Sequence, residues 1–458
     1  MRKHVSREAR VQRDGGRAPR HKRRKEPLYR REFARVSRQI TVAAIQLEAH
    51  DRSAFMQRWP QICTRIREAA SKGARLIVLP EGTVPAYVIG HEPVDVEILQ
   101  AALDDVQSLA RSTATVIVYG SVRRTSHEQY NSAYVVDSDG AVAGFADKCF
   151  LWHFDRNWFA TGRLGAPIQT SLGDLGVLIC ADGRIPTISR ALVDRGAEML
   201  VMPTAWVTSG RDPAQLENVQ ADLLAQVRAR ENSVPFVAAN KAGVEQSCVA
   251  YCGKSQIIAA DGTLVALASQ HREETLIETI DLAATRAPRA ELSNPQPAPI
   301  SDRDIRIAIT PYDVEAETSK ETLGADILIG PGTSGDAGLI EKAAAACVAD
   351  ELVSDPGGLI PHRLAGYQLL IWRSDFEDLS WTRTLARARA LELRLFIIVI
   401  CKGALAFAVD PDGAVVCGTF GGFRVTSFLF SPLRTQQTAV APATDIIEGL
   451  KRASLTPV

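Results

Sequence analysis

Long apolar runs are missing from this sequence, and so are cysteines at metal-binding spacing. No run approaches the roughly 20 apolar residues that a transmembrane helix needs, so the sequence excludes such a helix. The eight cysteines stand singly, without a CxxC motif or histidines at zinc spacing, which excludes a zinc site and a small disulfide scaffold. We therefore expect no metal site. We interpret seven of the cysteines as buried free thiols in a reducing compartment, the cytoplasm.

An overall excess of one charge sign is also missing, because 53 basic and 53 acidic residues balance. The balance hides an uneven distribution. Residues 1–40 hold 15 Lys and Arg against 4 Asp and Glu, whereas the remaining residues hold 38 against 49. The basic segment has few apolar residues to bury, so we predict a disordered extension over residues 1–38. We interpret it as a solvated extension and do not expect it to contact nucleic acid.

Hydrophobic residues make up 46% and charged residues 23% of the 458 residues, which is typical of globular proteins with several domains. From residue 40 onward, short apolar runs alternate with stretches of helical periodicity, and two hairpins with Asp-Gly turns (Asp139-Gly140 and Asp261-Gly262) are mixed in. This pattern predicts an α/β domain with a mixed sheet. The expected strands and helices lie at residues 40–47, 55–72, 75–79, 95–111, 115–122, 134–137, 141–145, 176–179, 188–195, 199–202, 214–231, 236–239, 254–259 and 263–267.

The C-terminal part of the chain repeats the first part in shortened form. The matching segments, in the same order in both parts, are Gly73–Pro80 with Gly324–Pro331, Gly196–Trp206 with Gly366–Phe376, and Leu224–Glu231 with Leu385–Glu392. About 80 residues from the middle of the unit are absent from the second copy. Prolines and weak periodicity over residues 283–304 indicate a linker. We therefore predict an extension (1–38), a first domain (39–285), a linker (286–304) and a degenerate second domain (305–458).

Three reactive side chains follow predicted strands of the first domain. Glu81 comes after the strand at residues 75–79, Lys148 comes after the first hairpin, and Cys180 begins a strand-to-helix turn. Open α/β sheets build their sites at such strand ends. A thiol beside a carboxylate and an ammonium can be deprotonated on demand, and the ammonium can stabilise an oxyanion. Together the three side chains predict nucleophilic catalysis by the cysteine.

The segments around these residues resemble the Glu-Lys-Cys motifs of the nitrilase, or carbon–nitrogen hydrolase, superfamily. The motifs are Leu79-Pro80-Glu81-Gly82, Asp147-Lys148-Cys149-Phe150-Leu151 and Leu178-Ile179-Cys180-Ala181-Asp182-Gly183-Arg184-Ile185-Pro186. Further support comes from Pro203-Thr204-Ala205-Trp206, from Arg228-Ala229-Arg230-Glu231-Asn232 before Phe236–Asn240, and from the second hairpin. The resemblance covers about residues 40–285 in the family's order and spacing. It implies an αββα sandwich that hydrolyses a non-peptide C–N bond through a thioester.

The resemblance also implies a role for each residue. Glu81 would be the general base and Cys180 the nucleophile, while Lys148 and the backbone N–H of Ala181 would receive the oxyanion. Many amidases of the family carry a second glutamate where this sequence has Asp155, whose carboxylate is one methylene shorter. We expect Asp155 to support the substrate or Lys148. The resemblance implies no cofactor and no metal ion.

The residues after the cysteine bear on the substrate. Nitrilases usually carry Trp-Glu at this place, whereas this chain has Ala181-Asp182, which favours an amidase or carbamoylase acting on a small amide or carbamoyl compound. Nitrile hydrolysis and acyl transfer on the same triad are alternatives. Another alternative is a catalytically lapsed scaffold whose basic tail contacts nucleic acid. The predicted pocket residues are Asn131, Tyr134, Trp152, His153 and Trp206.

The second domain is expected to lack catalytic residues. Gly332 stands at the position of Glu81, and the missing middle would have held the counterparts of the lysine and the cysteine. Domains of this superfamily typically pair through helices near the nucleophile. We therefore expect the second domain to pack on the first as an inactive partner, through a helix over about Ser380–Arg394. The sequence leaves undecided whether the chain forms homo-oligomers. We expect no contact with a membrane.

Overall fold

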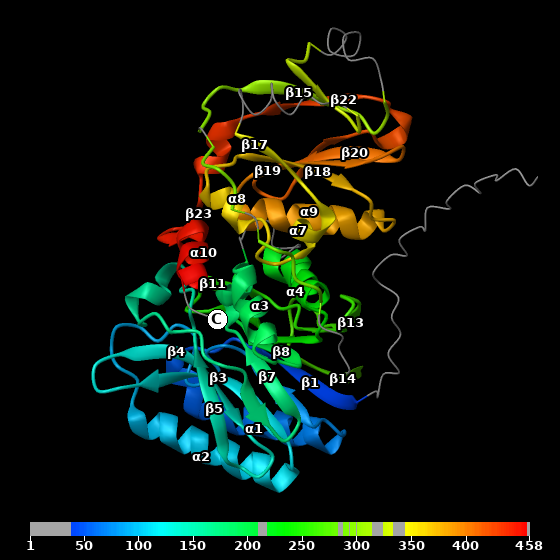
Figure 1. The fold of residues 1–458 in the computed structure, drawn as a ribbon. Helices are drawn as coiled ribbons and strands as arrows, with labels where there is room; N and C mark the ends of the chain where they lie inside the picture. The colour runs from blue at the N-terminus through cyan, green and yellow to red at the C-terminus, as the bar shows by residue number, and fades with distance from the viewer. Residues whose placement is uncertain are drawn as a thin grey trace, which may run out of the picture. The chain divides into compact units, whose positions relative to one another are not determined.

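The computed structural model describes residues 38–208, 218–282, 287–292, 294–298, 300–313, 324–332 and 344–455 (Figure 1). The predicted basic extension lies outside the described residues except for Arg38, and so do the first residues of the helix predicted at 214–231. The chain from Ser37 onward groups into one unit. In the described ranges, no helix combines the length and the apolar character needed to cross a membrane.

The first sheet of the N-terminal half has the strand order β11-β10-β1-β2-β3-β4-β5, and β14 also pairs with β1. Strand β1 runs parallel to β2 and β10 and antiparallel to β14, so the sheet is mixed, as predicted. The strands are β1 (Gln39–Glu48), β2 (Leu76–Val78), β3 (Val116–Arg124), β4 (Gln129–Val136), β5 (Val142–Asp147), β10 (Lys241–Glu245), β11 (Val249–Cys252) and β14 (Glu274–Asp281).

The second sheet has the order β13-β12-β9-β8-β7-β6, with β7, β8 and β9 parallel. Its strands are β6 (Ile168–Thr170), β7 (Gly173–Val177), β8 (Met199–Pro203), β9 (Phe236–Ala239), β12 (Gln256–Ile258) and β13 (Leu264–Leu267). Helices α3 (Pro186–Asp194) and α4 (Ala225–Asn232) pack on this sheet. The short helices of this half are η1 (Arg52–Ala54), η2 (His153–Asn157), η3 (Cys180–Arg184) and η4 (Gln220–Leu224), of which η4 is a π-helix.

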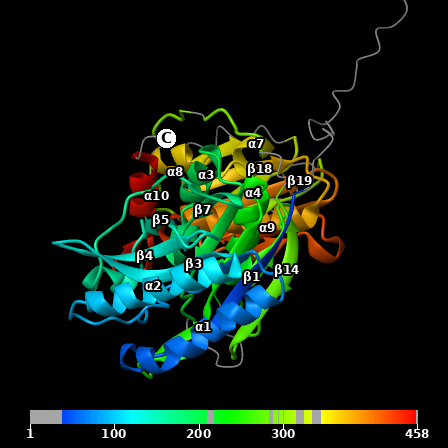
Figure 2. The same cartoon turned by 90° about the horizontal axis from the view of Figure 1, so that it is seen from below.

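The predicted αββα layering is confirmed, because alternate side chains of β1 pack into two different cores. Val42 and Ala44 belong to the core between the two sheets, whereas the alternate residues Ala43 and Ile45 pack under the outer helices. These helices are α1 (Phe55–Ser71) and α2 (Val96–Thr113), which lie along the first sheet (Figures 1 and 2). Because both faces of β1 are covered, apolar residues occupy adjacent positions from Val42 to Ile45 instead of alternating with polar ones.

The C-terminal half contains two more sheets, with the orders β16-β15-β22 and β17-β18-β19-β20-β21. The strands are β15 (Ile305–Ile309), β16 (Ile327–Ile329), β17 (Ala345–Val348), β18 (Leu369–Ser374), β19 (Phe396–Cys401), β20 (Leu405–Val409), β21 (Val415–Gly418) and β22 (Thr426–Phe430), followed by the small pair β23 (Ala439–Ala441) and β24 (Thr444–Asp445). The helices are α7 (Asp350–Ser354), α8 (Ile360–Leu364), α9 (Leu379–Leu393), α10 (Ile446–Leu455), η5 (Phe420–Gly422) and η6 (Pro432–Gln436).

Strand pairing in the C-terminal half follows that of the N-terminal half. Strand β15 is parallel to β16 and antiparallel to β22, as β1 is to β2 and β14. Likewise, β17, β18 and β19 are parallel and are followed by antiparallel β20 and β21, in the same arrangement as β7, β8, β9, β12 and β13. The chain between β16 and β17 is too short to hold counterparts of β3, β4 and β5.

The register of these strands corrects one prediction about the second half. Val177 pairs with Val201 of β8, and Cys347 pairs with Ile371 of β18. Ile371 matches Val201 in the repeat of Gly196–Trp206 as Gly366–Phe376. Three residues after Val177 comes Cys180, and three residues after Cys347 comes Asp350. The prediction that the nucleophile's position lies in the missing middle is therefore wrong. The position is present, and an aspartate at the start of α7 occupies it.

The cysteines correct a second prediction. All eight are free thiols, but Cys248 and Cys347 are exposed. Cys248 lies in the turn between β10 and β11, and Cys347 lies on the edge strand β17, so neither is enclosed by neighbouring strands. The expectation that all seven other thiols are buried was therefore too broad.

In the predicted linker, the described residues 287–292, 294–298 and 300–304 form no helix or strand.

Candidate active site

Three charged residues that lie far apart in the sequence meet in a fully buried cluster. Lys148 Nζ lies 2.7 Å from Glu81 Oε1 and 2.6 Å from Asp155 Oδ2, and none of the three side chains is exposed. Cys180, which is 4% exposed, lies close enough for its pKa to depend on Glu81 and Lys148. In the described ranges, no three His, Cys, Asp or Glu side chains are arranged to hold a metal ion.

Backbone geometry places the carboxylate and the thiol. Glu81 follows β2 and approaches Gly120 of β3 so closely that a Cβ at Gly120 would lie 2.5 Å from Glu81 Cα, which only glycine permits. Cys180 begins η3 with a φ of 46°. A non-glycine residue with this left-handed conformation is uncommon, and it persists where the surrounding structure holds it. The first N–H groups of η3, including that of Ala181, have no partner within the helix.

The two oxygens of the Glu81 carboxylate have different surroundings. Oε1 accepts hydrogen bonds from Lys148 Nζ (2.7 Å) and Asn131 Nδ2 (2.6 Å). Oε2 is buried and has no hydrogen-bond partner in the part of the chain that the structure describes. Burial raises the pKa of Glu81 above its usual value, Lys148 lowers it, and the charge of Asp155 raises it again. One oxygen of a more basic carboxylate is therefore available to accept a proton.

The thiol and the ammonium respond differently to burial. Burial and the charge of Glu81 raise the pKa of Cys180 to about 12, although Lys148 acts in the opposite direction. The resting side chain of Cys180 is therefore a thiol, which needs a base to become a thiolate at neutral pH. Burial also disfavours the Lys148 ammonium, but the carboxylates of Asp155 and Glu81 outweigh it and hold the pKa of Lys148 well above its usual range. This side chain stays positively charged at the site.

Asp155 reaches the lysine although its side chain is shorter than a glutamate. It lies in the short helix η2, where its Oδ2 accepts a hydrogen bond from the backbone N–H of Trp152 (2.9 Å) and also pairs with Lys148. Its Oδ1 accepts a hydrogen bond from the Tyr87 hydroxyl (2.8 Å). The tight turn of η2 thus makes up for the missing methylene. Tyr87 was not predicted, because nothing in its sequence context distinguishes it from a packing aromatic.

Asp182 has a structural role that its sequence context did not indicate. Its Oδ1 accepts hydrogen bonds from the backbone N–H groups of Cys149 (3.0 Å) and Phe150 (2.7 Å). Its Oδ2 accepts a hydrogen bond from the N–H of Ile179 (3.0 Å). Asp182 therefore ties the turn that carries the thiol to the segment that follows Lys148. Hydrogen bonds of backbone N–H groups to a carboxylate are among the stronger ones in proteins.

Cys180 lines a pocket of about 350 Å³. The predicted residues Trp152 and Trp206 also line it. The other lining residues are Arg184, Ala205, Val207, Thr208, Asn218, Val219, Gln220 and Val440. Val440 belongs to β23, so the C-terminal half contributes to the wall of the pocket.

The other three predicted pocket residues lie elsewhere. Asn131 binds Glu81, and His153 packs its ring against Phe154, with 4.7 Å between the ring centroids. The prediction for Tyr134 is wrong, because this side chain packs in the core under α1 and α2. Neighbouring side chains of a strand alternate between its faces, and Tyr134, three residues after Asn131, points to the opposite face of β4.

Arg184 is the charged residue of the pocket wall. Its guanidinium lies 4.5 Å from the centre of the Trp152 ring, and no carboxylate pairs with it among the described residues. Burial lowers the pKa of Arg184 to about 10, so it remains protonated near neutral pH. Polar atoms of three lining residues have no hydrogen-bond partner in the described chain: Arg184 Nε, Trp206 Nε1 and Gln220 Oε1.

Comparison with known proteins relates the N-terminal half of the chain to one family. A family profile described as carbon–nitrogen hydrolase matches residues 41–290. A hydrolase from Pseudomonas protegens is 32% identical over 235 residues, which cover 49% of this chain and 79% of that protein. An N-carbamoylputrescine amidase from Solanum tuberosum is 27% identical over 278 residues, covering 56% of this chain and 91% of that protein. The solved carbon–nitrogen hydrolase from Helicobacter pylori G27 covers 54% of this chain and 90% of its own, with 26% identity and a TM-score of 0.48.

Proposed function

This chain belongs to the carbon–nitrogen hydrolase family, and on that basis we propose that it is a thiol amidohydrolase for a small amide or carbamoyl compound. The observation that carries the proposal is the buried Oε2 of Glu81, which has no hydrogen-bond partner among the described residues and lies on a carboxylate beside a thiol that needs a base. The similarity to an N-carbamoylputrescine amidase supports a carbamoyl compound as substrate.

The first half of the reaction acylates the thiol. Glu81 takes the proton of Cys180, and the sulfur attacks the carbonyl carbon of the substrate. The ammonium of Lys148 and an N–H group at the start of η3 stabilise the negative charge that develops on the carbonyl oxygen. The C–N bond then breaks, and the leaving nitrogen takes the proton from Glu81. Ammonia or an amine departs, and a thioester remains.

The second half of the reaction hydrolyses the thioester. Glu81 takes a proton from water, and the hydroxide attacks the thioester carbon. The new tetrahedral intermediate uses the same oxyanion donors. When the C–S bond breaks, the proton on Glu81 returns to the sulfur of Cys180. The products are the free thiol and a carboxylic or carbamic acid.

Arg184 supports a narrower class of substrate. Among the described residues, the buried guanidinium of Arg184 has no carboxylate partner, and an anionic group of the ligand would supply one. Because Arg184 and Cys180 line the same pocket, one small molecule can contact both. We therefore propose a substrate with a carboxylate or similar anion at the end opposite the scissile amide, for example an N-carbamoyl amino acid.

Ammonia release from a substrate panel tests the general function. The panel contains primary amides, N-carbamoyl amino acids and nitriles, each incubated with the wild type and with Cys180→Ala. We expect the wild type to release ammonia from amides or carbamoyl compounds and the variant to release none. Release from nitriles alone would replace amide hydrolysis by nitrile hydrolysis. No release from any compound, together with a Cys180 that iodoacetamide does not alkylate, would favour the lapsed scaffold.

Arg184→Met tests the anion site. We expect kcat/KM for an anionic amide to fall by about 10- to 100-fold, the size of one charge-assisted hydrogen bond. The value for a neutral amide of matched shape should change little. The melting temperature should not fall, because the variant removes a buried charge that has no carboxylate partner in the described chain. Arg195→Met, at a half-buried arginine that donates to Gly165 O, is the control. Equal losses for both substrates would contradict an anion site.

A further inference from the structure

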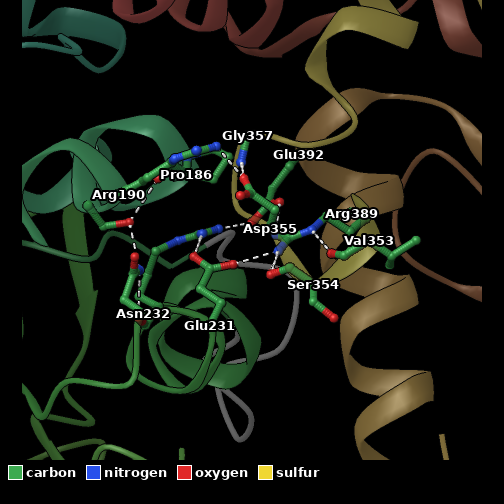
Figure 3. A network of polar contacts seen from close by, with 12 residues as sticks. Pro186, Arg190, Glu231, Asn232, Val353, Ser354, Asp355, Gly357, Arg389 and Glu392 are labelled. Carbon is green, nitrogen blue, oxygen red and sulfur yellow. Dashed lines mark hydrogen bonds and ion pairs between the residues drawn. The ribbon is translucent and has the colours of Figure 1, made fainter. Parts of the chain in front are cut away.

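The two halves of the chain meet across a buried cluster of two arginines and two glutamates, of which Figure 3 labels Arg389, Glu231 and Glu392. Arg389 of α9 pairs with Glu231 of α4 (2.7 Å) and with Glu392 of its own helix (2.8 Å). Arg228 of α4 pairs with the same two glutamates. The four side chains are at most 1% exposed. We call these four residues the interface cluster.

The interface cluster has an approximate two-fold symmetry that reaches the nucleophile turn. Arg228 donates from Nε to the carbonyl of Gly183 (3.0 Å), and Arg389 donates from Nε to the carbonyl of Val353 (2.9 Å). Gly183 lies three residues after Cys180, just as Val353 lies three residues after Asp350. Each arginine therefore holds the corresponding turn of its own half while it pairs with a glutamate of the other half.

Helix α10 approaches the same region from another side. A Cβ added to Gly449 would lie 2.6 Å from Phe150 and 2.8 Å from Ile185, so the helix packs directly on both side chains. Phe150 follows Lys148 by two residues, and Ile185 directly follows the turn that carries the nucleophile. Phe150, Ile185 and neighbouring residues of α10 belong to one continuous hydrophobic core.

A third contact holds the loop of Asp155. The hydroxyl of Thr444, on β24, accepts a hydrogen bond from the backbone N–H of His153 (2.7 Å) and donates to Pro442 O (3.2 Å). His153 has a φ of 41°, which a non-glycine residue adopts only where its surroundings hold it. Asp155 comes two residues later in the same short helix. Thr444 itself is 1% exposed.

From these contacts we infer that the C-terminal half positions the catalytic loops and completes the substrate pocket. Helix α10 and strand β24 contact the segments that carry Cys180, Lys148 and Asp155, and α9 reaches the nucleophile turn indirectly, through the pairing of Glu392 with Arg228. Val440 of β23 supplies part of the pocket wall. The half without its own nucleophile thus acts as a built-in positioning unit. The catalytic role of these loops rests on the proposed function. The contacts themselves do not depend on which substrate the protein uses.

Thr444→Val tests the inference at the single hydrogen bond between the His153 N–H and the Thr444 hydroxyl. The variant keeps the shape of the side chain and removes the acceptor for the His153 N–H. We expect the loop of Asp155 to loosen, which leaves Lys148 paired mainly with Glu81 and makes that carboxylate a weaker base. Both kcat and the rate of Cys180 alkylation by iodoacetamide should fall about fivefold, the size of one net hydrogen bond, with KM little changed.

Two further variants separate positioning from general stability. Thr444→Ser keeps the hydroxyl and should restore both rates. Thr438→Val removes a hydroxyl of the same segment that donates only to Asp445 of its own half (2.6 Å), and it should leave both rates unchanged. The exposed thiols Cys248 and Cys347, followed by mass spectrometry in the same samples, report any general change in reactivity.

The alkylation rate also separates this inference from the proposed function. Slower alkylation in Thr444→Val than in the wild type supports positioning even if no amide is hydrolysed. Hydrolysis by the wild type with unchanged rates in Thr444→Val overturns positioning and leaves the amidohydrolase in place. Equal losses in Thr438→Val and Thr444→Val also overturn it, because the effect would then come from the stability of the segment.

Discussion

Replacing Glu81 by glutamine lowers kcat on the order of a thousandfold while the protein stays folded. The glutamine is isosteric, and its oxygen can still accept hydrogen bonds from Asn131 and Lys148, as Oε1 does now. Its NH2 group takes the place of Oε2 and cannot accept a proton. Burial is the largest cause that raises the pKa of Cys180, and it persists in the variant, so few thiolates form at neutral pH without this base.

The protonation state of Glu81 determines how kcat/KM changes with pH. Burial raises the pKa of Glu81 above 4.5, and the carboxyl acts as a base only when it has lost its proton. The wild-type kcat/KM should therefore rise with pH through a value above 4.5, and this acid limb should be missing in Glu81→Gln. Rate profiles between about pH 4 and pH 8 measure the difference. Glu97→Gln, at an exposed residue of α2, is the control. An unchanged acid limb in Glu81→Gln would assign the base to another group.

Much of the N-terminal half could be predicted because its signals are local. The apolar run at residues 40–47 is continuous since both faces of β1 are covered, and the Asp-Gly pairs form turns with left-handed glycines at Gly140 and Gly262. The proposed catalytic residues stand at strand ends: Glu81 and Lys148 follow β2 and β5 of the first sheet, and Cys180 follows β7 of the second sheet, which packs face to face with the first. For Glu81, Lys148 and Cys180, position in the chain therefore predicted proximity in space.

Other features depend on contacts between distant segments, which a single sequence does not reveal. The bonds of Asp182 reach backbone groups about thirty residues away, and Tyr87 meets Asp155 across the loop of η2. Tyr134 was predicted to line the pocket and the strand was expected to begin at residue 134, whereas β4 extends back to Gln129 and places Tyr134 on the face opposite to Asn131. Asp350 was missed because its correspondence to Cys180 appears only in the strand register.

Arg389→Met lowers the free energy of unfolding by about 3–5 kcal/mol, the effect expected when one partner of a buried ion pair is lost. The variant leaves two buried carboxylates, Glu231 and Glu392, to share Arg228 as their partner in the interface cluster. It also removes the donor to Val353 O. Urea unfolding measures the change. Arg452→Met, which removes an exposed pair with Glu448, should change the free energy by about 0–1 kcal/mol.

Replacing the whole interface cluster by apolar residues separates its effect on stability from its effect on catalysis. The quadruple variant Arg228→Met, Glu231→Leu, Arg389→Met, Glu392→Leu buries no unpaired charge at the cluster, so most of the stability lost in Arg389→Met should return. Its kcat should be lower than that of the wild type, because Gly183 O has lost the guanidinium that holds the nucleophile turn. A folded quadruple variant with wild-type kcat would show that the cluster only joins the two halves. A quadruple variant as unstable as Arg389→Met would show that the loss in the single variant does not come from unpaired buried charge.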